Sequence, residues 1–175
     1  MRIVSLLPSA TEIVAGLGLQ ESLVGVSHCC DYPGSVHYLP RVTSSVVDAS
    51  ANSASIDQTV REHLSEQAAL YVLDTELLER LQPDLLVTQA LCDVCAVSGD
   101  DVEAAIRDLP TAPRVINLEP FSLDDVLETI KLIGEATSRQ AEADRQLSAL
   151  RGRIKAVRDR TQRFVEKPVS VLLLD

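Results

Sequence analysis

The chain has 175 residues, of which 46% are hydrophobic and 3% aromatic, and its formal net charge is −10 at pH 7. This length and composition exclude a disordered chain and allow one sizeable core, which must be built mainly from aliphatic side chains. The negative charge argues against a nucleic-acid groove or an anionic membrane surface as a partner, and no apolar run approaches the roughly 20 residues of a membrane span.

Short apolar runs alternate with amphipathic segments along the first two thirds of the chain. The strands expected from them cover residues 1–6, 23–26, 85–88 and 114–117. The helices expected around them cover residues 8–18, 56–64, 75–81, 102–109 and 123–137. Strand–helix units in sequence imply right-handed crossovers and one parallel sheet, so the predicted fold class is α/β, a parallel-sheet lobe with flanking helices.

A serine followed three residues later by Glu, Gln or Asp has the spacing of a capping box, in which side chains satisfy the first free amides of a helix. This pattern occurs at Ser9, Ser55 and Ser122, and each of these is expected to be the N-cap of its helix. The polar stretch Ser44–Ser55 is expected to be a loop.

The last third of the chain is highly charged and predicts one long spanning helix over residues 139–164. Its apolar positions alternate at spacings of three and four and form a narrow seam: Leu147, Leu150, Ile154, Val157 and Phe164. The seam suits either a coiled coil or a helix lying across a sheet domain. An apolar run over residues 169–174 predicts a strand before the chain stops at Asp175.

These elements predict three parts of the chain. Residues 1–121 are expected to form an α/β ligand-binding lobe, residues 122–166 a helix pair that includes the long helix, and residues 167–175 the first strand of a second lobe.

The turns after the strands of a parallel sheet gather along one edge, where ligands bind. Pro8, Ser9 and Tyr32 would line a shallow floor at this edge. Tyrosine offers a flat apolar face with a polar tip, which suits a large planar ring. The alternative is ordinary turn chemistry, in which Pro8 and Ser9 start a helix and Tyr32 packs beside Pro33.

The four cysteines form two local pairs, Cys29 with Cys30 and Cys92 with Cys95. A chain of this size does not need disulfide staples, so three interpretations stay open. The thiols could be buried and inert, they could form a redox pair, or together with His28 they could hold zinc or another soft metal.

Several segments resemble one family of transport proteins. They are residues 2–18 (RIVSLLPSATEIVAGLG), 31–33 (DYP), 77–88 (LLERLQPDLLVT), 91–97 (LCDVCAV) and 118–137 (LEPFSLDDVLETIKLIGEAT). The chain is similar to the cobalamin-binding substrate-binding proteins of ABC importers, in which one rigid helix joins two α/β lobes. Members of that family continue for a second lobe of comparable size, of which this chain would hold only the first strand.

The resemblance implies that Glu76, in the first turn of a helix, docks onto the importer permease. A carboxylate at that position also suits the helix dipole alone. His28 is a candidate axial ligand to a corrinoid cobalt. The sequence contains no nucleophile elbow, GxGxxG motif or phosphate-binding loop, so an enzyme is not expected.

The resemblance therefore implies a protein that binds cobalamin or a related corrinoid for an ABC importer, with an iron-siderophore or haem as alternative ligand. The second hypothesis is a cytoplasmic thiol or metal-handling protein, and the third is an assembly fragment whose seam helix dimerises. No cofactor, nucleic acid or membrane insertion is expected, and residues 139–174 are expected to mediate self-association. No leader precedes the first strand, so the chain as written is expected to be cytoplasmic, or periplasmic if a signal peptide has been removed.

Overall fold

The central sheet of the protein consists of four short parallel strands, β1 (Ile3–Ser5), β2 (Leu23–Val26), β5 (Leu85–Thr88) and β6 (Arg114–Asn117), in the order β2-β1-β5-β6. The computed structural model describes residues 1–48, 50–65, 70–89, 97, 99–107, 109–164 and 170–172. The predicted strands and the predicted parallel sheet are confirmed. Ile3, Val4 and the apolar side chains of β5 are buried, as continuous apolar strands require when both faces of a sheet are covered.

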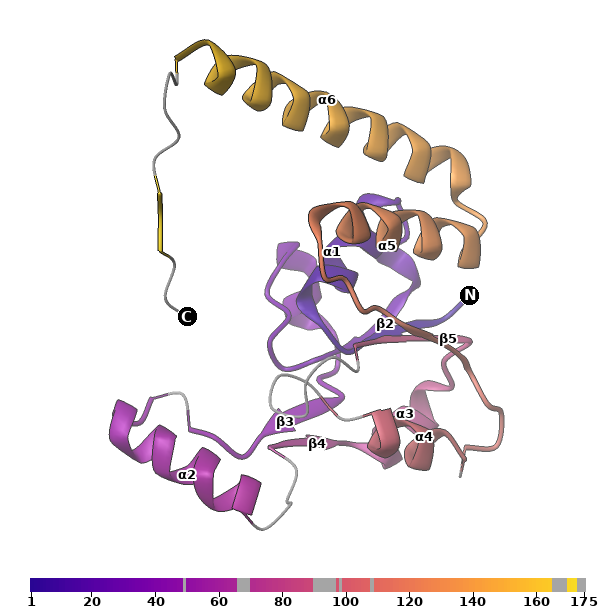
Figure 1. Cartoon of the computed structure of the whole chain (residues 1–175). Coiled ribbons are helices and arrows are strands. Elements are labelled where there is room, and N and C mark those ends of the chain that lie inside the picture. Colours follow the sequence, from indigo (N-terminus) through magenta and orange to yellow (C-terminus); the bar gives the residue numbers. More distant parts are fainter. Residues whose placement is uncertain are drawn as a thin grey trace.

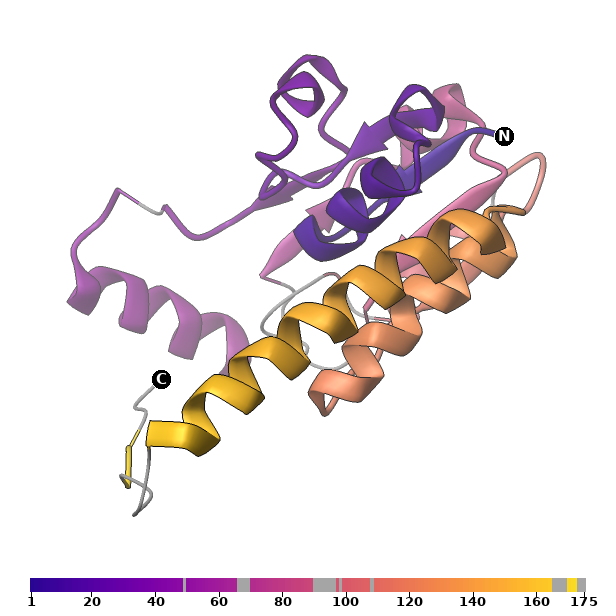
Figure 2. The same ribbon diagram turned by 90° about the horizontal axis from the view of Figure 1, so that it is seen from above.

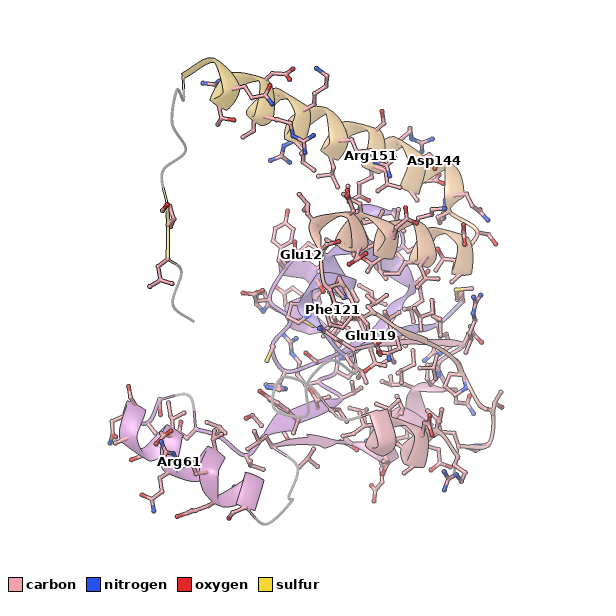
Figure 3. The ribbon with its side chains drawn as sticks, in the orientation of Figure 1. Glu12, Arg61, Glu119, Phe121, Asp144 and Arg151 are labelled. Atoms are coloured by element: carbon pink, nitrogen blue, oxygen red, sulfur yellow. The ribbon has the colours of Figure 1, made fainter. Side chains whose placement is uncertain are left out.

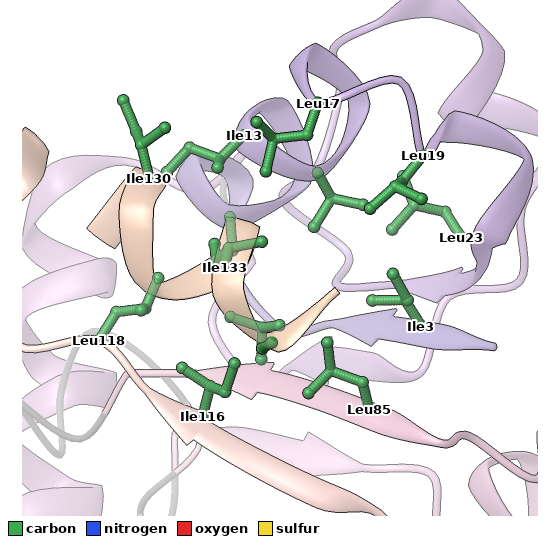
Figure 4. Packing of buried hydrophobic residues seen from close by; sticks show 14 of the residues in the cluster. Ile3, Ile13, Leu17, Leu19, Leu23, Leu85, Ile116, Leu118, Ile130 and Ile133 are labelled. Atoms are coloured by element: carbon green, nitrogen blue, oxygen red, sulfur yellow. The ribbon is translucent and has the colours of Figure 1, made fainter. Parts of the chain in front are cut away.

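Helices cover both faces of the sheet (Figure 1). One face carries α1 (Pro8–Gly16) and α5 (Leu123–Ala136), and the other carries α3 (Thr75–Leu81) and α4 (Gly99–Arg107). The hydrophobic core accordingly consists of two clusters, one on each face of the sheet. Figure 4 shows the larger cluster, on the α1 and α5 side, through the labelled residues Ile3, Ile13, Leu17, Leu19, Leu23, Leu85, Ile116, Leu118, Ile130 and Ile133. A smaller cluster on the other side includes Val4, Leu78 and Leu86.

The long helix α6 (Gln140–Phe164) runs beside α5 and continues past its end (Figure 2). Leu147 is buried in the larger cluster, Leu150 and Ile154 pack against it, and Val157 is 62% exposed. The seam therefore lies across the lobe through its first half. Because α5 and α6 share the core of residues 1–121, the predicted boundary after residue 121 does not coincide with a break in the hydrophobic core.

A second sheet was not predicted. β3 (Thr43–Ser45) pairs antiparallel with β4 (Tyr71–Leu73), and α2 (Ser53–Ser65) lies between them in sequence and projects from the lobe (Figure 1). The expectation that Ser44 and Ser45 belong to a loop is wrong. β3 is short and polar, so no local hydrophobic periodicity indicates a strand there. Its extended conformation depends on its pairing with β4. Two short 3-10 helices, Gln20–Ser22 and Gly34–Tyr38, complete the described elements.

Only one of the three expected serine caps is confirmed. Ser122 is the N-cap of α5, and its Oγ accepts from the backbone N–H of Asp125 at 3.2 Å. Helix α1 instead begins at Pro8, whose fixed φ suits the first helical position, and this places Ser9 inside the first turn. The side chain of Asn52 accepts from the backbone N–H of Ser55, which lies inside α2.

Half of the predicted strand over residues 169–174 lies outside the described residues. Its described part, Ser170–Leu172, has no regular secondary structure, and Val171 and Leu172 are each 82% exposed. Within the described ranges, none of the helices has the length and apolar character needed to cross a bilayer.

Candidate functional site

A hollow of about 320 Å³ opens at the carboxyl edge of the central sheet. We call it the edge hollow. It is lined by Leu6, Leu7, Pro8, Ser9, Ser27, His28, Cys29, Thr43, Tyr71, Gln89 and Val97. These residues come from the ends of β1, β2 and β5 and from the β3–β4 pair, so the structure brings together Pro8, Ser9 and His28, which were predicted as ligand-binding residues.

A second hollow of about 570 Å³, the side hollow, lies between α1, α5 and α6. It is lined by Ser9, Glu12, Ile13, Ala15, Gly16, Gln20, Tyr32, Pro33, Val126, Ile130 and Gln146. Tyr32, the remaining predicted ligand-binding residue, is 64% exposed here and is separate from His28. Ser9 lines both hollows, so the predicted floor consists of two adjoining depressions.

The imidazole of His28 is held by residues of the second sheet. Its Nδ1 lies 2.8 Å from Oγ1 of Thr43, which also accepts from the His28 backbone N–H at 3.0 Å. Its ring stacks on that of Tyr71, with centroids 5.5 Å apart and planes at 29°. Burial and then the positive charge of Arg41 lower the pKa of His28, so the ring is neutral at pH 7.

The adjacent cysteines have different surroundings. Cys29 is exposed, and its Sγ lies 3.0 Å from Nε2 of His28. Partial burial and then the neighbouring Cys30 raise the pKa of the Cys29 thiol, which is therefore protonated near neutral pH. Cys30 is only 1% exposed and belongs to the hydrophobic core.

A buried hydrogen-bond chain fixes the loop after β2 to α1. The Cys30 Sγ lies 3.1 Å from Thr11 Oγ1, Thr11 donates to Ser5 Oγ at 2.8 Å, and Ser5 donates to the carbonyl of Leu7. Arg41 donates from one guanidinium nitrogen to the carbonyl oxygens of residues 27 and 30. The loop that carries His28 is thus held from two sides.

The second predicted cysteine pair, Cys92 and Cys95, lies outside the described residues. Within the described part of the chain, no group of three or more His, Cys, Asp or Glu side chains is arranged to hold a metal ion. A shared metal or redox site of the two cysteine pairs therefore stays a prediction.

Sequence reasoning missed several residues at this edge. Thr43 and Tyr71 reach His28 through the β3–β4 pair, and Arg41 reaches its loop from an isolated bridge to Val26, and no local pattern indicates either pairing. Phe121, labelled in Figure 3, lies between β6 and α5 and is 82% exposed.

His28 is the one basic residue in the loops that follow the four parallel strands. Residues 7–10, 27–33, 89–98 and 118–122 hold neither Lys nor Arg, while Asp31, Asp93 and Glu119 lie within them. The guanidinium of Arg41 donates hydrogen bonds to the backbone carbonyls of residues 27 and 30. The four loops therefore add no Lys or Arg to this edge, and the positive charge beside His28 comes from Arg41.

Glu76 is exposed, as expected, with 88% of its side chain accessible. It lies in the first turn of α3, whose N-cap Asp74 accepts from the backbone N–H of Leu77 at 2.8 Å, and it pairs with Arg80 at 3.9 Å. Helix α3 covers the face of the sheet opposite α1 and α5, away from the side hollow (Figure 1).

Comparisons with known proteins agree with this architecture. The family model described as periplasmic binding protein matches residues 3–175. The uncharacterized ABC transporter substrate-binding lipoprotein YvrC of Bacillus subtilis (strain 168) is 24% identical over 161 residues, which are 92% of this chain and 42% of that protein.

Two solved structures show the same fold over 96% of this chain and 52% of their own. The periplasmic haem-binding protein RhuT from Roseiflexus sp. RS-1 is 25% identical with a TM-score of 0.68. The periplasmic vitamin B12-binding protein BtuF of Vibrio cholerae is 23% identical with a TM-score of 0.66. The chain spans about half the length of these structures and two fifths of the curated relative.

The matched family is one of solute-binding proteins, not of enzymes. Its model covers the chain from the first strand of the sheet to the last residue, through the lobe that carries both hollows and the long helix. The chain belongs to the periplasmic binding protein family.

Proposed function

We propose that this chain binds cobalamin or a related corrinoid at the carboxyl edge of its sheet, for delivery to an ABC importer. The observation that supports a corrinoid over other ligands is the lack of Lys and Arg in all four edge loops. Haem carries two propionate groups, and many ferric siderophore complexes are anionic. A corrinoid ring is bordered mainly by neutral amides.

Charge decides among these ligands because a carboxylate taken out of water needs a partner. Burying an ionised carboxylate without one is costly, and like charges across an interface oppose binding. Asp31 and Glu119 would repel propionates, whereas amide groups can hydrogen-bond to acidic and hydroxyl side chains without a net charge.

The shape of the edge also supports a large flat ligand. Ser9 joins the two hollows, and the exposed ring of Tyr32 stands at the rim of the side hollow. Aromatic faces bind planar rings through area and stacking. The names of two solved structures similar to this chain contain vitamin B12 and haem, and both ligands are metal-centred macrocycles.

The test is a parallel titration of the chain with aquocobalamin and with haemin, followed by calorimetry and absorbance. We expect a measurable heat and a spectral change with aquocobalamin and weaker or no saturable binding of haemin. Tyr32→Ala should weaken corrinoid binding, while Tyr38→Ala, which removes a 91% exposed tyrosine that lines neither hollow, should not. The absence of both heat and spectral change at millimolar aquocobalamin would refute the proposal.

Membership of the family supports a location outside the cytoplasm and a permease partner, and we include both in the proposal. The alternative, a thiol or metal-handling protein, has one observation in its favour: the Cys29 thiol within 3.0 Å of the His28 ring. Elemental analysis of purified protein decides it, since stoichiometric zinc that is lost in Cys29→Ser would favour metal handling.

A further inference from the structure

We propose that His28 coordinates the metal of the bound corrinoid through Nε2, as an axial ligand. This inference rests on the proposed function and adds to it a residue and a bond. It follows from the way in which the protein holds the imidazole beside the edge hollow.

The ring of His28 is oriented from two directions. Thr43 contacts Nδ1 at 2.8 Å, and Tyr71 stacks on the ring face at a centroid distance of 5.5 Å. Both partners come from the β3–β4 pair, so the imidazole of His28 is held by residues from other segments of the chain. A ligating histidine is typically fixed in this way, through a hydrogen bond of the nitrogen that does not bind the metal.

The proposal requires one tautomer. Oγ1 of Thr43 has two lone pairs, so it can accept both the His28 backbone N–H and the ring Nδ1–H. The lone pair then lies on Nε2, where it accepts the S–H of Cys29 at 3.0 Å. In the ligand-free protein the thiol therefore occupies the position that a metal would take.

Access to Nε2 requires only a surface side chain to move. Cys29 is exposed, whereas the backbone of its loop is fixed by Arg41 and by the buried chain through Cys30. His28 and Cys29 line the edge hollow together with Pro8 and Ser9, so a ligand that displaces the thiol reaches Nε2 from this hollow.

The step is a ligand exchange without electron transfer. The bond between Co(III) and an axial water breaks, the water leaves with its electron pair, and the Nε2 lone pair forms the new cobalt–nitrogen bond. Imidazole nitrogen is a common ligand for metals of this class. No proton moves, because Nδ1 keeps its hydrogen toward Thr43.

The test uses diaquocobinamide, which has no nucleotide base and hence no axial nitrogen of its own. We expect wild-type protein to shift its absorption bands as imidazole replaces water. After reduction to Co(II) with dithionite, electron paramagnetic resonance should show the triplet splitting that a single ¹⁴N axial ligand produces. Protein labelled with ¹⁵N-histidine should show a doublet instead, which identifies histidine without any substitution.

Variants assign the signal to one histidine. His28→Gln should abolish the splitting, while His37→Gln, which removes a histidine that does not line the edge hollow, should retain it. Cys29→Ser should also retain the nitrogen splitting, because the metal displaces the Cys29 thiol and does not bind to it. Thr43→Val should weaken diaquocobinamide binding by about 10–100-fold, as loss of a supporting contact does at metal sites.

The outcomes separate the two proposals. Binding of diaquocobinamide with no nitrogen splitting, or with a splitting that survives in His28→Gln, would overturn axial ligation and leave corrinoid binding intact. An absorption shift without nitrogen splitting that is lost in Cys29→Ser but retained in His28→Gln would assign the bond to sulfur and also overturn axial ligation by His28. If neither diaquocobinamide nor aquocobalamin binds, the proposed function itself fails.

Discussion

Gly134 of α5 lies against Ala143 of α6 so closely that a β-carbon built on Gly134 would be 2.6 Å from the Ala143 Cβ. The same atom would lie 3.3 Å from the carbonyl oxygen of Arg139. The glycine therefore sets how closely the long helix approaches the lobe, and through it the depth of the side hollow that both helices line.

Gly134→Ala should destabilise the protein, although alanine favours helices. Overpacking costs about 1–3 kcal/mol, which exceeds the gain of roughly 1 kcal/mol from helix propensity. Gly152→Ala in α6 is the matched control, because no atom lies within 4 Å of its added β-carbon, and it should stabilise the protein slightly. Urea unfolding measures both, and equal effects of the two substitutions would contradict the close packing.

The N-cap of α5 should make stability depend on pH. A hydrogen bond from the Ser122 side chain, and then that from the Phe121 backbone N–H, lower the pKa of Asp125. A carboxylate whose pKa is lower in the folded than in the unfolded protein stabilises the fold at pH values above the ordinary carboxyl pKa. This contribution disappears as the pH falls through the pKa that the group has in the folded protein.

Asp125→Asn should therefore lower the unfolding free energy at pH 7, and its effect should shrink as the pH falls below the ordinary Asp pKa of about 3.9. Ser122→Ala should cost about 0.5–2 kcal/mol. Asp144→Asn makes the same charge change on α6 as a control. A difference between Asp125→Asn and wild type that stays constant from pH 7 to pH 3 would contradict this account.

Thiol labelling should distinguish the two adjacent cysteines. Cys29 is exposed and Cys30 is 1% exposed, so Cys29→Ser should remove one reactive thiol from native protein and Cys30→Ser none. Because the pKa of Cys29 is raised, its labelling rate should keep increasing with pH above the ordinary thiol pKa of roughly 8.5. Fast labelling at neutral pH that is lost only in Cys30→Ser would show the opposite arrangement.

Glu76→Ala should leave the fold intact and weaken docking to the cognate permease. The carboxylate is almost fully exposed, and its surface pair with Arg80 is worth at most about 1 kcal/mol. Docking is read from stimulation of the importer ATPase in proteoliposomes. Glu135→Ala, an equal charge change on the opposite side of the sheet, is the control, and equal stimulation by both variants and wild type would exclude Glu76 as a docking residue.

The chain is expected to self-associate through residues 139–174. Val157, Val171 and Leu172 are exposed, and burial of one such side chain is worth about 1.5–3 kcal/mol. Val157→Lys should lower the association constant in sedimentation equilibrium, while Leu132→Lys on α5 should not. A monodisperse wild-type monomer at high micromolar concentration would show that these side chains stay exposed.

Local patterns were enough to predict most elements of the lobe. Continuous apolar runs such as Leu85–Thr88 indicated the parallel strands, and the seam through Leu147 indicated the long helix, because burial on a fixed face imposes a period on neighbouring residues. The cap at Ser122 was predictable, but the same spacing at Ser9 misled, since Pro8 set the helix start.

The sequence by itself thus determined the α/β order, the family and the charge of the edge loops. Only the tertiary structure decided what surrounds His28. Thr43 and Tyr71 lie far from it along the chain and meet it because β3 and β4 pair beside the carboxyl edge. Such pairing depends on long-range hydrogen bonds and packing, which leave no period in the sequence, so this part of the site became visible only in the folded chain.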